Sequence, residues 1–215
     1  MKTKCILPFR ILLVLPMLCP GLQGCIEMAV VGAGAAVVSS VDRRTTGVQV
    51  DDEGIELRAG NRVNERFGDK VHVNITSYNR SVLVTGEVPD VNTKAEIEKL
   101  IQGVPGLRGV TNDLQVAGNA SLGSRANDTT ITGKVKARLF DSGKVNPIHV
   151  KVITESSVVY LLGIVTEAEA GAAVEVARTT GGVRKVVKVF EYCKPTDAVC
   201  AAPKPAAAEP KKSGS

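Results

Sequence analysis

Histidine, cysteine and clustered carboxylates are the side chains of this sequence that could do chemistry. It has five Cys and only two His, His72 and His149. Each His falls at the same point of two similar segments, in an expected strand, with no Ser or Cys motif beside it to activate. Two His leave little room for a His-rich metal site, and the acidic run 51–53 falls at an expected helix start, where carboxylates are favourable anyway. We therefore predict no catalytic residue, no metal site and no cofactor.

The first 25 residues have the pattern of an export signal that ends in a cysteine. Basic residues among the first ten precede an apolar stretch over residues 11–18, and Leu22-Gln23-Gly24-Cys25 follows. These four residues resemble the lipobox of bacterial lipoproteins. The resemblance implies a signal peptide over residues 1–24 and acylation of Cys25. No Asp follows Cys25, which among such lipoproteins favours the outer membrane. An ordinary signal peptide with a chance cysteine is the alternative.

Loss of the signal peptide would remove most of the net charge. The whole chain has 27 basic and 22 acidic residues, a net +5, and residues 1–24 contain three of the basic residues and none of the acidic ones. The mature chain would therefore carry 24 basic and 22 acidic residues, a net +2. Aromatic residues make up only 3% of the chain, which argues against a stacking platform for single-stranded nucleic acid. We expect no nucleic-acid partner.

Acylation of Cys25 would leave Cys193 and Cys200 as an even pair. An oxidising periplasm favours a disulfide between them, closing a short loop. A metal or redox role is the weaker alternative, because no His lies near them and their spacing is not Cys-x-x-Cys. Residues 193–215 are thus predicted to hold a disulfide and then a disordered tail rich in Ala, Pro and Lys.

Residues 25–47 are predicted to form a tether between the acylated cysteine and the folded part. The apolar run over residues 26–41 is too short to cross a bilayer comfortably as a helix, and it contains Glu27.

Two copies of one unit follow, which predicts two domains, over residues 48–118 and 119–192. Asp52 matches Asp128 at an offset of 76 residues, and Gly86 matches Gly163 at an offset of 77. The change of offset places insertions in loops, as expected for diverged repeats.

Each copy has the same predicted order: helix, strand, strand, helix, strand. Apolar residues recur every fourth position in the first helix, and we expect the preceding Asp52 and Asp128 to cap the helix start. Strands are predicted around Val71 to Ile75 and from Ile148 to Val152, each paired with a following strand. A last strand of the first copy contains Val110, Leu114 and Val116. The fold class is α+β, with two helices on one face of a three-stranded mixed sheet in each domain.

That element order resembles the BON domain. The resemblance rests on Val48-Gln49-Val50-Asp51-Asp52, on Asn127-Asp128-Thr129, and on the run from Gly163 to Ala170, behind the lipobox. It implies a non-enzymatic outer-membrane lipoprotein on the periplasmic face. Such a protein binds anionic phospholipid through its second domain and supports outer-membrane integrity, including at division sites. The sequence departs from the resemblance at Thr130, where an aromatic residue is expected near the membrane, and in the Cys193 to Cys200 extension.

Charge is divided between the copies in a way that fits this implied lipid contact. Residues 48–118 have 8 basic and 11 acidic groups, whereas residues 119–192 have 10 basic and 7 acidic groups. In the second copy a cationic ridge borders an apolar edge on the first helix. The predicted lipid-binding residues are Thr130, Ile131, Lys134, Val135 and Arg138. The alternative is a solvated helix face, and Arg62 in the first copy matches Arg138, so a basic residue here could belong to the fold.

A second candidate surface lies on the strand face turned away from the helices. Its apolar side chains are Val158, Tyr160, Leu162 and Ile164. Because helices cover only one face of each sheet, we predict that the first domain or another protein covers this strip. The second possibility gives the alternative function, an adaptor that docks envelope-assembly or peptidoglycan-associated proteins.

Overall fold

The computed structural model describes residues 42–118 and 122–201, and these described residues belong to one compact unit. The predicted signal peptide, Cys25, most of the predicted tether and the Ala- and Pro-rich tail lie outside the described residues. None of the helices within the described ranges is long and apolar enough to cross a membrane.

The first domain has the predicted order. It comprises α2 (Thr46–Phe67), the short 3-10 helix η1 (Gly68–Lys70), β1 (His72–Tyr78), β2 (Ser81–Val88), α3 (Val91–Gln102), β3 (Gly109–Asn112) and β4 (Gln115–Val116). Strand β1 is antiparallel to β2, while β3 and β4 both pair in parallel with β2. The sheet is therefore mixed, and its predicted last strand is divided in two at Asp113 and Leu114.

The second domain repeats this plan. It comprises α4 (Leu122–Ser142), the 3-10 helix η2 (Pro147–His149), β5 (Lys151–Glu155), β6 (Val158–Val165), α5 (Glu167–Arg178) and β7 (Lys185–Tyr192). Strand β6 is central, antiparallel to β5 and parallel to β7. The predicted strand from Ile148 to Val152 was wrong at its start, because Pro147 opens a 3-10 turn there. His149 ends that turn, so the two His do not occupy equivalent strand positions.

The fourfold apolar spacing correctly identified the core-facing side of each first helix. Ile55, Ala59 and Val63 are buried under the first sheet, and the matching residues of α4 are buried under the second. The repeated glycine of the central strand is needed for close backbone approach. A Cβ at Gly86 would collide with the carbonyl oxygen of His72, and one at Gly163 would collide with that of His149.

The repeated aspartates do not cap helix starts as predicted. Thr45 caps α2, so Asp52 lies in its second turn, and Asp128 likewise lies within α4. Asp128 instead accepts hydrogen bonds from the backbone N–H groups of Ser156 and Ser157 at 2.9 and 2.8 Å. Asp52 accepts the equivalent pair from Asn79 and Arg80, together with the Ser77 hydroxyl. Each aspartate therefore fastens its helix to a hairpin turn.

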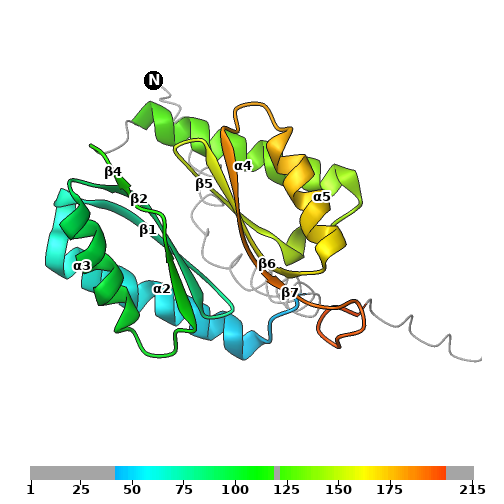
Figure 1. Cartoon of the computed structure of the whole chain (residues 1–215), viewed down its shortest axis with the longest axis horizontal. Helices are drawn as coiled ribbons and strands as arrows, with labels where there is room; N and C mark the ends of the chain where they lie inside the picture. The colour runs from blue at the N-terminus through cyan, green and yellow to red at the C-terminus, as the bar shows by residue number, and fades with distance from the viewer. Residues whose placement is uncertain (1–41, 119–121, 202–215) are drawn as a thin grey trace, which may run out of the picture. The chain divides into compact units, whose positions relative to one another are not determined.

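The two sheets meet on the faces that their helices leave uncovered (Figure 1). This interdomain interface has an apolar centre to which both domains contribute, with Tyr78 and Leu83 from the first and Tyr160, Leu162 and Ile164 from the second. Helices lie on the outer side of each sheet, so the described unit has four layers (Figure 1).

Candidate functional site

The outward face of α4 is a ridge of three small residues and one aromatic residue, with lysines on both sides. Ala126, Gly133, Ala137 and Phe140 follow one another at spacings of seven, four and three residues, which places them along one helix face. All four are exposed. Lys134 and Lys136, also exposed, flank Gly133 and Ala137. We call this set the α4 ridge.

Phe140 is the ridge residue that sequence reasoning missed. It is 74% exposed near the end of α4, whereas its neighbour Leu139 is fully buried. Its exposure could have been predicted from the helical spacing. Phe140 directly follows the core residue Leu139, and each residue of a helix is turned by about 100° from the one before, away from the core. An aromatic residue was expected near Thr130, and the chain has one ten positions later on the same helix.

The predicted lipid-binding residues fall into three groups in the structure: exposed residues, core residues, and Arg138, which is hydrogen-bonded to the end of α5. Thr130 and Lys134 are exposed, and the Thr130 hydroxyl donates to the Ala126 carbonyl oxygen at 2.9 Å. Ile131 and Val135, at 1% and 0% exposure, belong to the domain core. They orient α4 but do not face solvent, so neither can contact a lipid while the domain is folded.

Arg138 ties α4 to the end of α5. Its guanidinium donates to the Thr180 hydroxyl at 2.7 Å, to the Thr179 hydroxyl and to the Val176 carbonyl oxygen at 3.1 Å each. The matching Arg62 donates to the Leu100 carbonyl oxygen at 3.3 Å. A structural arginine at this position is therefore common to both domains, and Arg138 is not a free cation on the ridge.

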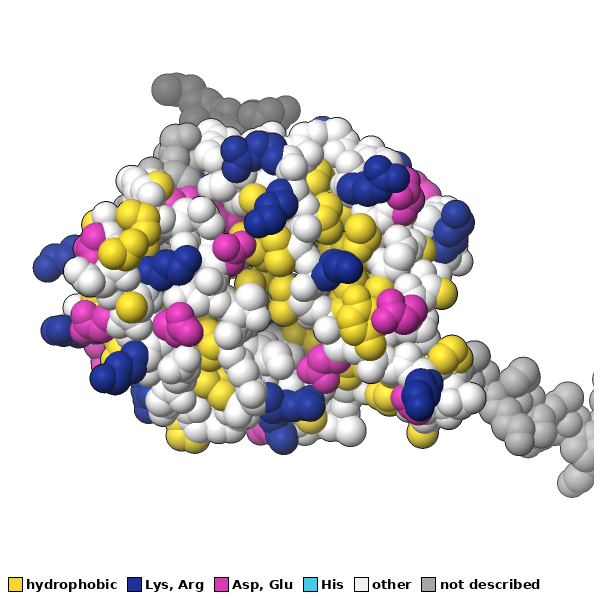
Figure 2. Space-filling view, in the orientation of Figure 1, with side chains coloured by type: hydrophobic (Ala, Val, Ile, Leu, Met, Phe, Trp, Pro, Cys, Tyr) yellow, Lys and Arg dark blue, Asp and Glu magenta, His cyan; other side chains and the backbone are white. Residues whose placement is uncertain are grey.

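The predicted apolar strip on β6 is buried by the first domain. Tyr160, Leu162 and Ile164 are buried, at 2%, 1% and 9% exposure, and the partly buried Val158 packs against the same cluster. The Tyr160 hydroxyl donates to Asp113 of the first domain at 2.8 Å. A groove of about 340 Å³ remains at the margin between β3 and β7, and Figure 2 shows apolar side chains gathered over β7 on this side. The strip itself is not available to an outside protein.

Cys193 and Cys200 are joined by a disulfide directly after β7. Asp197 organises the loop between them by accepting from the backbone N–H groups of Lys194 and Cys200. Cys200 is 6% exposed and packs into the interdomain cluster. The disulfide therefore fixes a short loop over one end of the interdomain interface.

The residues just before α2 connect both domains. Arg43 makes two hydrogen bonds, of 2.8 and 2.9 Å, to the carboxylate of Glu169 at the start of α5. Arg44 pairs with Asp42 and Asp52 and lies 4.0 Å from the centroid of the Tyr78 ring. Burial raises the pKa of Tyr78 to about 12. The last residues of the predicted tether thus belong to the folded unit.

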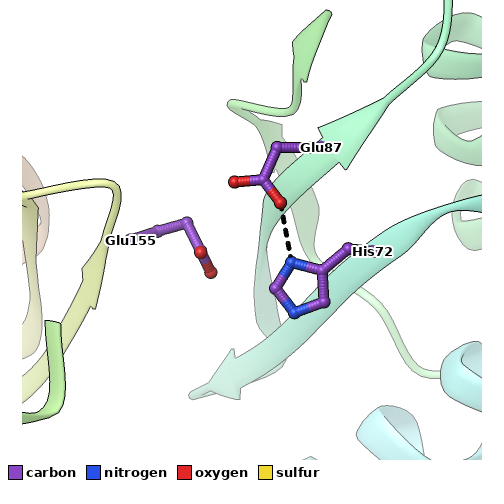
Figure 3. A group of neighbouring side chains, drawn as sticks. All are labelled: His72, Glu87 and Glu155. Carbon is purple, nitrogen blue, oxygen red and sulfur yellow. Dashed lines mark hydrogen bonds and ion pairs between the residues drawn. The ribbon is translucent and has the colours of Figure 1, made fainter. Parts of the chain in front are cut away.

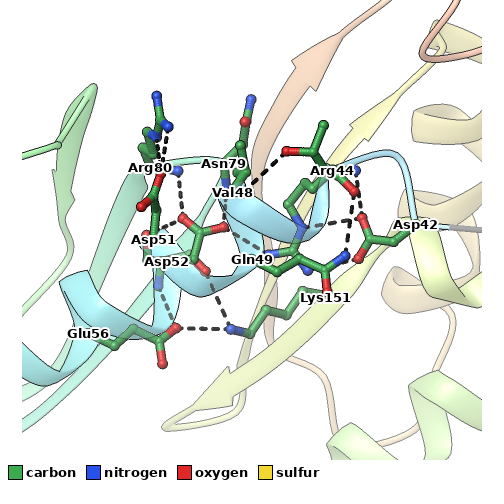
Figure 4. A network of polar contacts seen from close by, with 12 residues as sticks. Asp42, Arg44, Val48, Gln49, Asp51, Asp52, Glu56, Asn79, Arg80 and Lys151 are labelled. Carbon is green, nitrogen blue, oxygen red and sulfur yellow. Dashed lines mark hydrogen bonds and ion pairs between the residues drawn. The ribbon is translucent and has the colours of Figure 1, made fainter. Parts of the chain in front are cut away.

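A polar network extends this connection into the interdomain interface (Figure 4). Glu56 of α2 accepts from the Lys151 ammonium of the second domain at 3.1 Å and from the backbone N–H of Ser77 at 2.7 Å. Lys151 of the second domain and Ser77 of the first thus donate to the same Glu56 carboxylate oxygen.

A second polar group in the interface combines one imidazole with two carboxylates (Figure 3). His72 on β1, Glu87 on β2 and Glu155 on β5 each offer one donor atom, and these atoms lie within 4.8 Å of one another. The His72 Nδ1 is 2.8 Å from Glu87 Oε2. Desolvation by burial raises the pKa of Glu155 above its ordinary value. Sequence reasoning missed this group, because its members come from two domains and are brought together only by the interface.

The comparisons with known proteins agree with this architecture. The family model described as the BON domain matches residues 51–118 and residues 127–194. The chain is 40% identical over 173 residues to the outer membrane lipoprotein DolP of Haemophilus influenzae, covering 80% of this chain and 90% of that protein.

Two further relatives extend the likeness. The chain is 34% identical to the 21 kDa hemolysin of Actinobacillus pleuropneumoniae, over 71% of this chain and 79% of the relative. It is 30% identical to osmotically-inducible protein Y of Escherichia coli, over 72% of this chain and 78% of the relative. None of these names describes an enzyme.

Proposed function

We propose, from the premise that the chain belongs to the BON-domain family, that it is a lipid-anchored envelope protein whose second domain binds anionic phospholipid. The relative named as an outer membrane lipoprotein and the lipobox at Leu22 to Cys25 support an anchor at the outer membrane, on its periplasmic face. Support of outer-membrane integrity, including at division sites, is the role we propose for this attachment.

The observation that carries the proposal is the α4 ridge. Its small residues let the helix backbone approach a bilayer surface closely, while Lys134 and Lys136 can extend their ammonium groups to lipid phosphates on both sides. The exposed Phe140 supplies an apolar side chain that can enter the interfacial region.

The strength expected of the ridge is modest. Each Lys near an anionic surface contributes about 1 kcal/mol, so two contribute about 2 kcal/mol, or about thirtyfold in partitioning. That is weak and reversible binding. It becomes effective when an acyl anchor at Cys25 already holds the domain near the membrane, because the second contact is then intramolecular.

The test compares vesicle binding of the full chain with that of a Lys134→Gln, Lys136→Gln double variant. Co-sedimentation with vesicles that contain or lack anionic phospholipid measures the partitioning. We expect the double variant to show an anionic-lipid-dependent partitioning about thirtyfold lower than that of the unmodified chain. Phe140→Ser should weaken binding to both kinds of vesicle. All three side chains are exposed, so the fold should survive.

A matched control is Lys70→Gln, Lys99→Gln, which removes two exposed lysines from the first domain. It changes the net charge equally but leaves the α4 ridge intact. If this control loses as much binding as the α4 variant, attraction is a property of net charge and the assignment to α4 fails. The adaptor function has no comparable support, because the strip proposed for docking is buried by the first domain.

A further inference from the structure

We propose that His72, Glu87 and Glu155 form a binding site for a divalent transition-metal ion, with Zn²⁺ as the expected ligand, between the two domains. The proposed ligands are distinct from the α4 ridge, since none of the three residues lies on α4.

The donor atoms are placed for one ion. Two come from neighbouring strands of the first domain, at the paired positions His72 and Glu87, and the third comes from the end of β5 in the second domain (Figure 3). Tetrahedral Zn²⁺ with bonds of about 2.0–2.2 Å requires donors about 3.4 Å apart. The imidazole and the Glu87 carboxylate, now 2.8 Å apart, need to separate only slightly, and Glu155 already lies within 4.8 Å.

The carboxylates are buried and held in position. Glu87 is 3% exposed and Glu155 is 5% exposed. Glu87 Oε1 accepts from the Ser156 hydroxyl at 3.2 Å, and Glu155 Oε2 accepts from the Asn74 amide at 2.6 Å. Such outer contacts orient metal-ligating carboxylates. The Glu87 oxygen that would bind the ion, Oε2, now lies 2.8 Å from His72 Nδ1.

The charge of the group suits a divalent cation. Metal ligands bind in their deprotonated forms, so two carboxylates and one imidazole would bring two negative charges to a bound ion. Burial of charge is costly unless it is balanced. One divalent ion balances both. The bound ion would connect β1 and β2 to β5, so its binding energy would stabilise the pairing of the two domains.

The donor set also selects among ions. One imidazole nitrogen with two carboxylates is a donor set suited to Zn²⁺ and its transition-metal neighbours, whereas Ca²⁺ and Mg²⁺ require about six or more oxygen ligands. A cavity of about 420 Å³ borders the group and is lined by His72, Asn74 and Glu155 together with residues of α4. It offers an entry path and room for a water as fourth ligand.

Isothermal titration with ZnCl₂ of the full chain, treated with chelator and dialysed, tests the site. We expect one equivalent of Zn²⁺ to bind, with competition from Co²⁺ but not from excess Mg²⁺. Glu155→Gln and His72→Asn should each weaken binding about tenfold or more. The matched control is His149→Asn, which removes the other His of the chain and should leave binding unchanged. Absence of binding by the unmodified chain, or binding that survives both cluster substitutions, overturns the proposal.

A residue-specific measurement on the unmodified chain covers the case in which a variant does not fold. Zn²⁺ should shift the NMR signals of the His72 ring and leave those of the His149 ring in place. Shifts confined to His149, or no shift at His72, would locate the ion elsewhere and refute the assignment.

Discussion

At the scale of single residues, the buried aspartates of the first helix in each domain stabilise the hairpin turns. The turns place two non-glycine residues each in the left-handed region, with φ of 52° and 64° at Asn79 and Arg80 and of 49° and 63° at Ser156 and Ser157. Such a turn is costly for residues with a Cβ. The hydrogen bonds from its N–H groups to an aspartate carboxylate offset that cost.

Removing this carboxylate should therefore destabilise the domain more than an ordinary surface change. Asp128→Ala leaves the N–H groups of Ser156 and Ser157 without their acceptor, and we expect a loss of about 2–4 kcal/mol in the free energy of unfolding. Urea denaturation measures it. Asp141→Ala, an exposed change on the same helix, is the control and should stay within about 0.5 kcal/mol. Equal effects would show that the turn does not depend on Asp128.

The same residues show where sequence reasoning succeeds and where it stops. The repeat identified Asp52 and Asp128 as equivalent, but their role was misassigned because α2 begins earlier, at Thr46 with Thr45 as its cap. Helix ends depend on such local caps, which compete along the chain. The hydrogen-bond partners of a buried carboxylate are distant in sequence, so only the fold reveals them.

At the scale of elements, β6 and the η2 turn require a glycine at their contact. A side chain at Gly163 would meet the His149 carbonyl oxygen, which is backbone and cannot move aside. Gly163→Ala should therefore destabilise the second domain by about 1–3 kcal/mol or more. Gly133→Ala on the exposed face of α4 is the opposite case, since nothing lies within 4 Å of the added Cβ. It should stabilise by about 0.5–1 kcal/mol, because alanine favours the helix.

Thermal unfolding of both glycine variants checks this pair of expectations. A neutral Gly163→Ala would mean that the strand can shift away from η2, and the repeated glycine would then need another explanation. The element order was predictable from apolar spacing in both copies. The start of the second hairpin was not, because Pro147 breaks a run of apolar residues that otherwise has the period of a strand.

At the scale of the whole described unit, the sequence indicated that the open faces of the sheets need a cover, but not which cover. Alternation on β6 shows an apolar strip, yet a second domain and an outside protein would cover it equally well. The first domain presents Thr85 and Glu87 on its side of the interface, both buried, and such polar residues give no sign of burial in the sequence. For the same reason the His72, Glu87 and Glu155 group could not be predicted.

The ion pair between Arg43 and Glu169 joins the residues before α2 to the second domain. It should make the pairing of the two domains sensitive to acid. Burial alone would raise the pKa of Glu169, but hydrogen bonds from Arg43 and from Thr166 lower it to about 2. A carboxyl whose pKa is lower in the folded than in the unfolded chain stabilises the fold above its unfolded pKa, which is about 4.3 for Glu. That contribution is lost as the pH falls from about 4.3 through about 2.

Arg43→Gln should remove much of this contribution. We expect the variant to be less stable than the unmodified chain near neutral pH, and the difference in urea midpoint to shrink progressively below pH about 4. Arg66→Gln is the matched control, because its pair with Glu96 is 62% and 41% exposed and should contribute little at any pH. A difference for Arg43→Gln that stays constant down to pH about 2 would mean that Arg43 acts through packing and its bond to the Ile164 carbonyl oxygen rather than through the charge of Glu169.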